Sequence, residues 1–398
     1  MFKATKVRIY PTQEQVDFLN RQFGAVRFAW NKALAIKNHC YKVRKQNLSP
    51  VKDLKPLLAV AKKSRKYSWL KEVDSMALQQ SVINLDKAFQ NFFNPKLEAG
   101  FPRFKSKHGK QSSYHCTSVS VGSDWVKVPK CKPIKAKVHR EISGNIKSIT
   151  LSRALTGKYY ASVLVDDGLS MPSPIQELQA DKITGVDVGI TDIVITDKGL
   201  KTGNPRFLKN AQKNLKRKQK ALSRCKKGSK GRAKAKLLVA KAHERVAFAR
   251  NDFQHKLSKQ LIDESQAVIV ETLKVSNMLK NHCLARAIAD AGWHSLVTKL
   301  DYKSKQAGKH LVKIDQWFAS SKTCSCCGQK QEKMPLNIRS WKCECGATHD
   351  RDINAAINIK QQGILKLKAE GLSVSANEGK RKSGILSVAA CEVGSLAR

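Results

Sequence analysis

The sequence predicts an α+β protein of several domains, and three observations lead to this class. A short alternating strand opens the chain, helical patterns follow up to residue 93, and short alternating runs continue to residue 165. After residue 183, short apolar runs alternate with long helical patterns, which is typical of strands covered by helices. Four cysteines between residues 324 and 345 indicate a small metal-bound module. The chain has 398 residues, 41% of them hydrophobic, which is enough for two or three packed domains.

The first part of the chain predicts a β-barrel that helices interrupt. The first ten residues alternate between apolar and polar, as in a half-buried strand. Thr12 and Gln15 are placed to form a capping box at the start of a helix. The alternating runs beyond residue 118 predict an antiparallel sheet or barrel. We therefore expect a barrel made of residues 1–10 and 96–170, with a helical insert at 11–95.

A second domain is expected to begin near Ile183 with a strand that runs to Gly189. A hairpin is predicted at Ile193–Gly199. The β-branched run Ala267–Val270 predicts a strand buried on both faces. Ile288–Ala307 predicts one amphipathic helix, and His310–Ile314 predicts a further strand.

The charge of the chain indicates a polyanionic partner. Lys and Arg outnumber Asp and Glu by 75 to 31, which gives a formal net charge of +44. Self-repulsion of this size destabilises a compact chain unless an anion neutralises it. Between residues 201 and 250 only Glu244 is acidic, and Gly228 and Gly231 divide this basic segment into two predicted helices. A solvated charged face normally mixes both signs, so we interpret the segment as a phosphate-binding hairpin. The residues expected to bind nucleic acid are Lys209, Lys213, Lys216, Arg217, Lys220 and Arg224.

Binding to a membrane surface is the competing explanation for such charge. No apolar run approaches the roughly 20 residues that a spanning helix needs, and the N-terminus has no apolar signal core. We therefore expect an intracellular protein without a membrane partner. In that compartment the eleven cysteines are expected to be thiols or metal ligands and not disulfides.

Three acidic residues stand at the ends of predicted elements. Asp187 lies in the strand that begins at Ile183, and Glu271 directly follows the buried run 267–270. Asp352 lies in the first turn of the last predicted helix. Ligands of open α/β sheets gather at the carboxyl ends of strands, and carboxylates that converge can bind a divalent cation. Taken alone, each of these residues is equally consistent with an ordinary surface acid.

Asp350 and Asp352 compete for the third position. Residues two apart in a helix point about 200° apart, so they do not both face one site. Asp350 stands where an N-cap is expected. Asp352 shares its side with Ala355 and Ala356, which are small enough to let the helix approach a metal. We therefore expect Asp352 to be the metal ligand and Asp350 to be the cap.

Small and apolar neighbours complete this prediction. Gly185 and Gly189 share a strand face with Asp187, and their missing side chains are expected to leave room for a metal and a nucleic-acid backbone. On the last helix, Ile353 and Ile357 are expected to hold the helix to the core.

Two cysteine knuckles, each followed by glycine, predict a zinc ribbon. Four thiolates at this spacing bind Zn²⁺ tetrahedrally and replace a core too small to fold alone. The second knuckle is Cys-x-Cys and not Cys-x-x-Cys, and Cys326 is an additional thiol. Unliganded buried thiols are the alternative. The residues expected to hold a closed, structural Zn²⁺ are Cys324, Cys327, Cys343 and Cys345.

From Met1 to about Gly363 the chain resembles the TnpB family, the OrfB-type proteins of bacterial insertion sequences, which are related to type V CRISPR effectors. The stretches that carry the resemblance are Arg8–Thr12, Arg27–Leu34, Phe101–Lys107, Gly185–Gly189, Val270–Glu271, the two cysteine knuckles and Asp350–Ala356.

The resemblance implies a wedge-like barrel with an inserted helical recognition domain, followed by an RNase-H-like (RuvC) nuclease domain. We expect the nuclease at residues 183–320 and 348–363, interrupted by the zinc ribbon at 321–347. A disordered tail is expected at 364–398. The resemblance also implies a guide RNA, cut from the transposon end, that pairs with double-stranded target DNA beside a short motif. The protein is then expected to be a monomer in the bacterial cytoplasm, associated with the nucleoid.

The implied chemistry is metal-assisted hydrolysis of a phosphodiester bond. Asp187, Glu271 and Asp352 would hold two Mg²⁺ ions about 4 Å apart. A guided DNA-binding repressor without cleavage is one alternative, and the presence of all three acids argues against it. A transposase that transfers strands is the other, and a strand-transfer assay would distinguish it.

Overall fold

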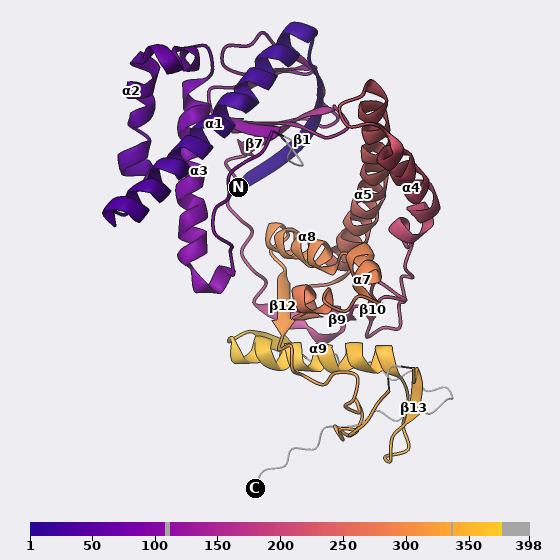
Figure 1. Ribbon diagram of the computed structural model, residues 1–398. Helices are drawn as coiled ribbons and strands as arrows, with labels where there is room; N and C mark the ends of the chain where they lie inside the picture. Colours follow the sequence, from indigo (N-terminus) through magenta and orange to yellow (C-terminus); the bar gives the residue numbers. More distant parts are fainter. Residues whose placement is uncertain (108–111, 336, 376–398) are drawn as a thin grey trace. The chain divides into compact units, whose positions relative to one another are not determined.

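The computed structural model describes residues 1–107, 112–335 and 337–375. The chain divides into two compact units, Met1–Ser170 and Met171–Arg398. Each unit combines helices with a sheet, which confirms the predicted α+β class (Figure 1). Within the described part of the chain, no helix has both the length and the apolar character needed to cross a bilayer.

The first unit is built on a seven-stranded antiparallel sheet in the order β2-β6-β7-β1-β5-β4-β3. The strand that opens the chain, β1 (Phe2–Tyr10), lies between β7 (Tyr159–Asp166) and β5 (Ile134–Lys137). Its alternation buries Val7 and Ile9 in the core of the unit. The other strands are β2 (Ser112–Cys116), β3 (Ser120–Val121), β4 (Trp125–Lys127) and β6 (Asn145–Arg153).

Helices follow β1 in the chain. Helix α1 (Gln13–Arg44) begins with the predicted capping box, in which Thr12 and Gln15 each bond the other's backbone N–H. Helix α3 (Ser75–Phe93) packs on α1 through a second cluster that includes Leu34. The remaining helical segments of the unit are η1 (Pro50–Leu54), α2 (Leu57–Lys63), η2 (Arg65–Lys71) and η3 (Pro95–Leu97).

The second unit contains a four-stranded sheet in the order β10-β9-β11-β12. Strands β9 (Ile183–Asp187), β11 (Ala267–Glu271) and β12 (His310–Ile314) are parallel, whereas β10 (Ile195–Thr196) is antiparallel to β9. Because the three parallel strands run the same way, their carboxyl ends meet at one edge of the sheet. The strands predicted at 267–270 and 310–314 are confirmed.

Helices cover both faces of this sheet. Val186, Val268 and Val270 pack on one side with residues of α5 (Lys230–Glu264) and α8 (Trp293–Gln306). On the other side, Ile183 and Ile269 pack with residues of α9 (Arg351–Ala369). Figure 1 shows α9 lying along the sheet, beneath β9 and β12. Burial on both faces explains why these strands are continuous apolar runs.

Smaller elements complete the second unit. Helix α4 (Phe207–Arg224) packs on α5 to form the predicted basic hairpin. The others are β8 (Glu177–Gln179), η4 (Ala180–Lys182), α6 (Val275–Met278), α7 (Ala285–Ala291), β13 (Ser340–Lys342), β14 (Thr348–Asp350) and β15 (Ser373–Ser375).

Three predictions need correction. The single helix predicted at Ile288–Ala307 is two helices, because Gly292 has a left-handed backbone (φ 66°) between α7 and α8. The predicted tail from residue 364 begins too early, since α9 continues to Ala369, buries Leu367, and is followed by β15 paired with β8. The last part of that predicted tail, 376–398, lies outside the described residues.

The third correction concerns the face of α9 that meets the core. Ala355, Ala356 and Ile359 are buried there, whereas Ile353 and Ile357 are only half-buried. The buried residues are those on the side of Asp352, so the side predicted to face a metal is also the side that packs on the sheet.

Candidate active site and metal centre

Two of the three predicted acids end neighbouring parallel strands. Asp187 is the last residue of β9 and Glu271 is the last residue of β11. Their side chains are close enough for the charge of Glu271 to act on Asp187. Burial, together with the charges of Glu271 and Asp352, raises the pKa of Asp187 well above its usual range. Both the burial and the neighbouring negative charges disfavour the ionised form of Asp187, and a bound cation would offset them.

The third acid reaches the same edge from α9. Asp350 caps this helix, because its Oδ1 accepts the backbone N–H groups of Asp352 and Ile353, both at 3.1 Å. Its Oδ2 accepts a bond from Lys201 Nζ at 2.6 Å. Asp352 is close enough to Asp187 for its charge to contribute to the raised pKa of that residue. The structure therefore places Asp187, Glu271 and Asp352 close enough for the charges of Glu271 and Asp352 to act on Asp187, and it engages Asp350 as the helix cap.

The glycines beside the first acid have a different role from the one predicted. A Cβ on Gly185 would lie 2.1 Å from the carbonyl oxygen of Ala356 and 2.7 Å from Cβ of Lys360. A Cβ on Gly189 would lie 2.8 Å from the carbonyl oxygen of Asp192. The missing side chains are therefore filled by the protein's own backbone, and the expectation that they leave room for a ligand is wrong. At Gly185 this close contact sets how near α9 lies to β9.

Two residues that the sequence did not single out contact the acids. Ser320 is buried and donates its hydroxyl to Glu271 Oε1 at 3.2 Å. Arg339, from the segment between the cysteine knuckles, places its Nη1 3.1 Å from Asp352 Oδ2. No sequence pattern distinguishes either residue, since Arg339 is one of 75 basic residues in the chain. Both contacts restrict the orientation of a carboxylate.

The four predicted cysteines form one cluster. The Sγ atoms of Cys324, Cys327, Cys343 and Cys345 all lie within 4.8 Å of one another. Two of these separations are 3.7 Å, between Cys324 and Cys345, and 3.6 Å, between Cys327 and Cys343. A tetrahedral zinc site with Zn–S bonds of about 2.3 Å has S···S edges of about 3.8 Å. The sulfurs are thus arranged as a zinc ion requires.

Local geometry shapes the two knuckles and shifts the pKa values of their thiols in different directions. Gly328 and Gly346 have left-handed φ angles of 77° and 86°, which explains the glycine after each knuckle. A backbone hydrogen bond from Gln329 lowers the pKa of Cys327 to about 7, which favours the thiolate. Burial raises the pKa of Cys324; at Cys343 a backbone hydrogen bond from Cys345 is outweighed by burial and the neighbouring thiols, which raise the pKa to about 12. His349, which the sequence analysis did not include, places its Nε2 3.0 Å from Cys324 Sγ.

Helix α9 links the cysteine cluster to the acids. The amide of Asn354 accepts the N–H of Ser325 at 2.9 Å and donates to the carbonyl of Thr323 at 2.7 Å. One turn later, Asn358 donates to the carbonyls of Ser320 and Thr323, at 2.8 and 2.6 Å. Both asparagines are buried. The first knuckle and the serine that holds Glu271 are therefore fixed to the helix that carries the third acid.

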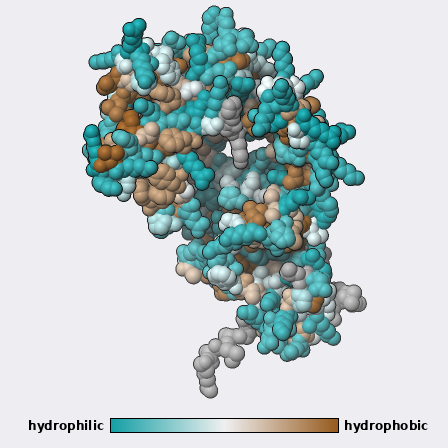
Figure 2. Space-filling model, in the orientation of Figure 1, coloured by the Kyte–Doolittle hydropathy of each residue, from teal (hydrophilic) through white to brown (hydrophobic). Residues whose placement is uncertain are grey.

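The six basic residues predicted to bind nucleic acid lie on α4. At 100° per residue they fall within an arc of about 100°, so they form one face of the helix. All six are exposed, and within the described part of the chain none of them forms an ion pair. Figure 2, in the orientation of Figure 1, shows mainly hydrophilic side chains over this region. The start of α4 is anchored, because the Asp290 carboxylate accepts the N–H groups of Leu208 and Lys209 and pairs with Arg250 at 2.9 Å.

Three family models match the chain. Residues 1–46 match a family described as "Helix-turn-helix domain", residues 168–282 one described as "Probable transposase", and residues 293–359 one described as "Cas12f1-like, TNB domain". The first two models both carry the family label OrfB_IS605. In the structure, residues 1–46 form β1 and the single helix α1, so the first match identifies a family and not a helix-turn-helix motif.

Known proteins resemble the chain over most of its length. It is 38% identical over 367 residues to a "Putative RNA-guided DNA endonuclease" of Streptomyces pristinaespiralis, covering 91% of this chain and 89% of that protein. It is 28% identical over 379 residues to "Putative RNA-guided DNA endonuclease InsQ" of Escherichia coli (strain K12), covering 91% and 92%. It also resembles a chain in "Cryo-EM structure of the Cas12f1-sgRNA-target DNA complex", with a TM-score of 0.49, 15% identity, and coverage of 90% and 98%.

Proposed function

The chain belongs to the TnpB family of RNA-guided DNA endonucleases, and we propose that it cuts guide-selected target DNA by metal-dependent hydrolysis of a phosphodiester bond. The observation that supports this most is the meeting of Asp187, Glu271 and Asp352, which are far apart in sequence, at one edge of the sheet. A protein that only bound DNA would have no need for this cluster of acids.

The acids fit a divalent metal. Carboxylate oxygens are the preferred ligands of Mg²⁺. Burial and the charges of Glu271 and Asp352 raise the pKa of Asp187, although Arg339 pairs with Asp352. When bound at Asp187, Glu271 and Asp352, two Mg²⁺ ions would supply a water of lowered pKa and stabilise charge on the leaving oxygen.

The protein's own residues fix the orientation of the three acids. Asp187 is held by the end of β9, and Ser320 donates to one oxygen of Glu271. Asp352 is held by the capped start of α9 and by Arg339. Carboxylates fixed in this way need little rearrangement as the reaction proceeds, which is how preorganised sites lower a barrier.

The cysteine cluster supports a structural role for zinc. Four thiolates complete a tetrahedron and leave no position for a substrate. Within the fold, the bound metal would hold the knuckles beside α9, and with them the segment that carries Arg339. Zinc would therefore act on cleavage through the position of that segment.

The remaining parts are assigned to nucleic-acid binding. We assign the sheet of the first unit to a wedge domain with the helices after β1 as its recognition insert, and the second unit to a RuvC-like nuclease with its zinc ribbon. The exposed basic face of α4 would contact phosphates of a guide RNA derived from the transposon end, or of the target DNA. Base pairing with the guide would select the sequence, which requires only backbone contacts from a monomeric protein.

A comparison of four variants tests this proposal. Asp187→Ala, Glu271→Ala and Asp352→Ala should each abolish single-turnover cleavage of a matched plasmid with Mg²⁺, while guide and target binding remain. Asp350→Ala is the control, since it should cost a helix cap, about 1 kcal/mol, and the partly exposed ion pair with Lys201, and leave measurable cutting. If all four variants cut normally, these acids are not the catalytic site. Joined DNA products in place of cut ends would point to strand transfer.

A further inference from the structure

A short loop, Asp315–Ser320, begins and ends close to Glu271. It begins directly after Ile314, which lies opposite Glu271 in the pairing of β12 with β11. It ends at Ser320, which donates to Glu271 Oε1 at 3.2 Å. Since an extended chain spans at most about 3.5 Å per residue, the middle of the loop lies within roughly 10 Å of those end points.

Trp317 occupies the middle of this loop. It is 82% exposed, more than any other large hydrophobic residue in the described part of the chain. Its backbone N–H donates to Asp315 Oδ1 at 2.7 Å, so the turn that presents the indole is held in place. A tryptophan this exposed is unusual, because its large apolar ring is normally buried on average. The exposed indole of Trp317 is therefore a candidate contact for a ligand.

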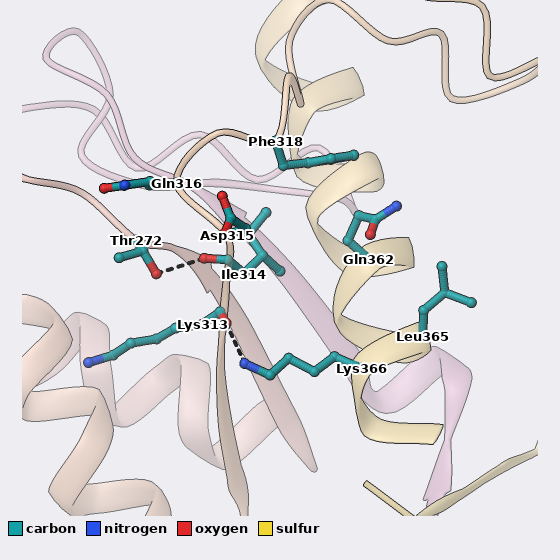
Figure 3. Close-up of a pocket in the computed structure, with 9 residues that line it drawn as sticks. All are labelled: Thr272, Lys313, Ile314, Asp315, Gln316, Phe318, Gln362, Leu365 and Lys366. Atoms are coloured by element: carbon teal, nitrogen blue, oxygen red, sulfur yellow. Dashed lines mark hydrogen bonds between the residues drawn. The ribbon is translucent and has the colours of Figure 1, made fainter. Parts of the chain in front are cut away.

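Two cavities share Thr272 and Lys313 in their linings, and the larger one also borders the loop. The larger one, about 840 Å³, is lined by Phe318 of the loop, by Thr272 and Lys313 at the strand ends, and by Gln362 of α9 (Figure 3). The smaller one, about 100 Å³, is lined by Glu271 and also by Thr272 and Lys313. Lys313 therefore lines the smaller cavity together with Glu271, a proposed catalytic acid.

The charges around the larger cavity suit a phosphate. Lys313 is exposed at the junction of the two cavities. A second ammonium, on Lys366, donates to the carbonyl of Lys313 at 3.0 Å, as drawn in Figure 3. The single acid of this lining, Asp315, has one oxygen engaged by the Trp317 N–H. A cation that shares a cavity lining with a carboxylate, four residues before an exposed aromatic ring in the chain, matches a strand whose bases stack and whose phosphates alternate with them.

We propose that Trp317 is a positioning residue on which one base of the DNA strand to be cut stacks, with Lys313 contacting a phosphate of that strand. This inference rests on the proposed nuclease function and adds the substrate subsite beside its acids. The ligand is single-stranded, since a base within a duplex has both faces covered by its neighbours. A peptide partner would explain the exposed indole and would leave the cation beside the acids without a role.

The test uses the full chain with its guide and a matched target. Trp317→Ala should lower the single-turnover cleavage rate about 5- to 150-fold, the range that stacking of one base on an aromatic ring contributes. Trp317→Phe should restore most of the rate. Affinities for the guide and the target should stay within twofold of the wild type. Tyr302→Ala, which removes an aromatic side chain 37% exposed on α8, is the control and should cleave normally.

A second readout does not depend on cleavage. In the Asp187→Ala protein, 2-aminopurine is placed at successive positions of the target strands near the cut. One position should be quenched, and Trp317→Ala should relieve that quenching. Unchanged cleavage and unchanged fluorescence in Trp317→Ala overturn the inference alone. Equal losses of cleavage and of guide or target affinity also overturn it, because Trp317 would then contact the guide, the duplex or a protein partner. A wild type that binds guide and target without cutting removes the proposed function, and the fluorescence still decides the stacking.

Discussion

Replacing Gly185 by alanine should separate folding from catalysis at the carboxylate cluster. The new Cβ would lie 2.1 Å from the carbonyl oxygen of Ala356 and 2.8 Å from the backbone N of Lys360. Close C···O contacts in proteins are about 3.3 Å, so α9 must retreat from β9 by about 1.2 Å. Rotamer changes cannot relieve this overlap, because it is between backbone atoms. Overpacking of this kind costs about 1–3 kcal/mol.

The cost to cleavage should exceed the cost to stability. Helix α9 carries Asp352, and a shift of about 1 Å in a reacting group can lower a rate about 100-fold. The assays are thermal unfolding, expected to fall by about 2–4 °C per kcal/mol, and single-turnover cleavage with guide and Mg²⁺. The matched control is Gly24→Ala within α1, where the nearest atom is 3.9 Å away and a gain of about 0.5–1 kcal/mol is expected. Normal cleavage and an unchanged unfolding temperature in Gly185→Ala would refute the close approach of α9.

Three further predictions concern metal, proton and salt. Protein purified without chelator should contain about one zinc per chain by elemental analysis. The Cys343→Ser variant should lose the zinc, and its free energy of unfolding should fall by several kcal/mol. The Cys326→Ser variant, which changes a cysteine outside the cluster, should keep the zinc and the stability of the wild type. Because the pKa of Asp187 is raised in the folded state, the wild type without Mg²⁺ should lose stability as pH rises above about 4 through that pKa. The unfolding temperature of Asp187→Asn should fall less than that of the wild type between pH 4 and pH 8. If the two proteins show the same dependence of unfolding temperature on pH, the pKa of Asp187 is not raised. Lys216→Glu should weaken the binding of RNA and DNA and reduce the dependence of that binding on salt concentration, while the target sequence stays the same. A change in the target sequence that is cut would argue against a phosphate contact.

Sequence patterns were sufficient to place a residue when its position depends only on the helix, strand or turn that contains it. Asp187 and Glu271 could be placed because each follows a run of buried β-branched residues, and parallel strands must end at a common edge. Asp350 and Asp352 could be separated because helix geometry allows only one of them to be the cap. The cysteine cluster followed from ligand spacing, which local chain geometry fixes.

The contacts that tune the site depend on segments that meet only in the folded chain. Arg339 reaches Asp352 because Arg351 donates its N–H to the Arg339 carbonyl, which joins the ribbon to the start of α9. Ser320 reaches Glu271 because Asn358 holds its carbonyl from a later helix. In each case the partner is a common residue type, and nothing in its own neighbourhood marks it.

Gly185 shows why a correct residue can receive a wrong explanation. A glycine beside an acid indicates that a side chain is excluded, but the sequence does not say what excludes it. The structure places α9 there, and Asp197 fastens the contact by accepting the Gly185 N–H at 3.0 Å and the Lys360 ammonium at 2.8 Å. The space beside Gly185, which the sequence analysis assigned to a ligand, is therefore filled by α9, the helix that carries Asp352. When a strand contains a glycine beside an acidic residue, close packing of one of the protein's own helices should be considered before room for a substrate.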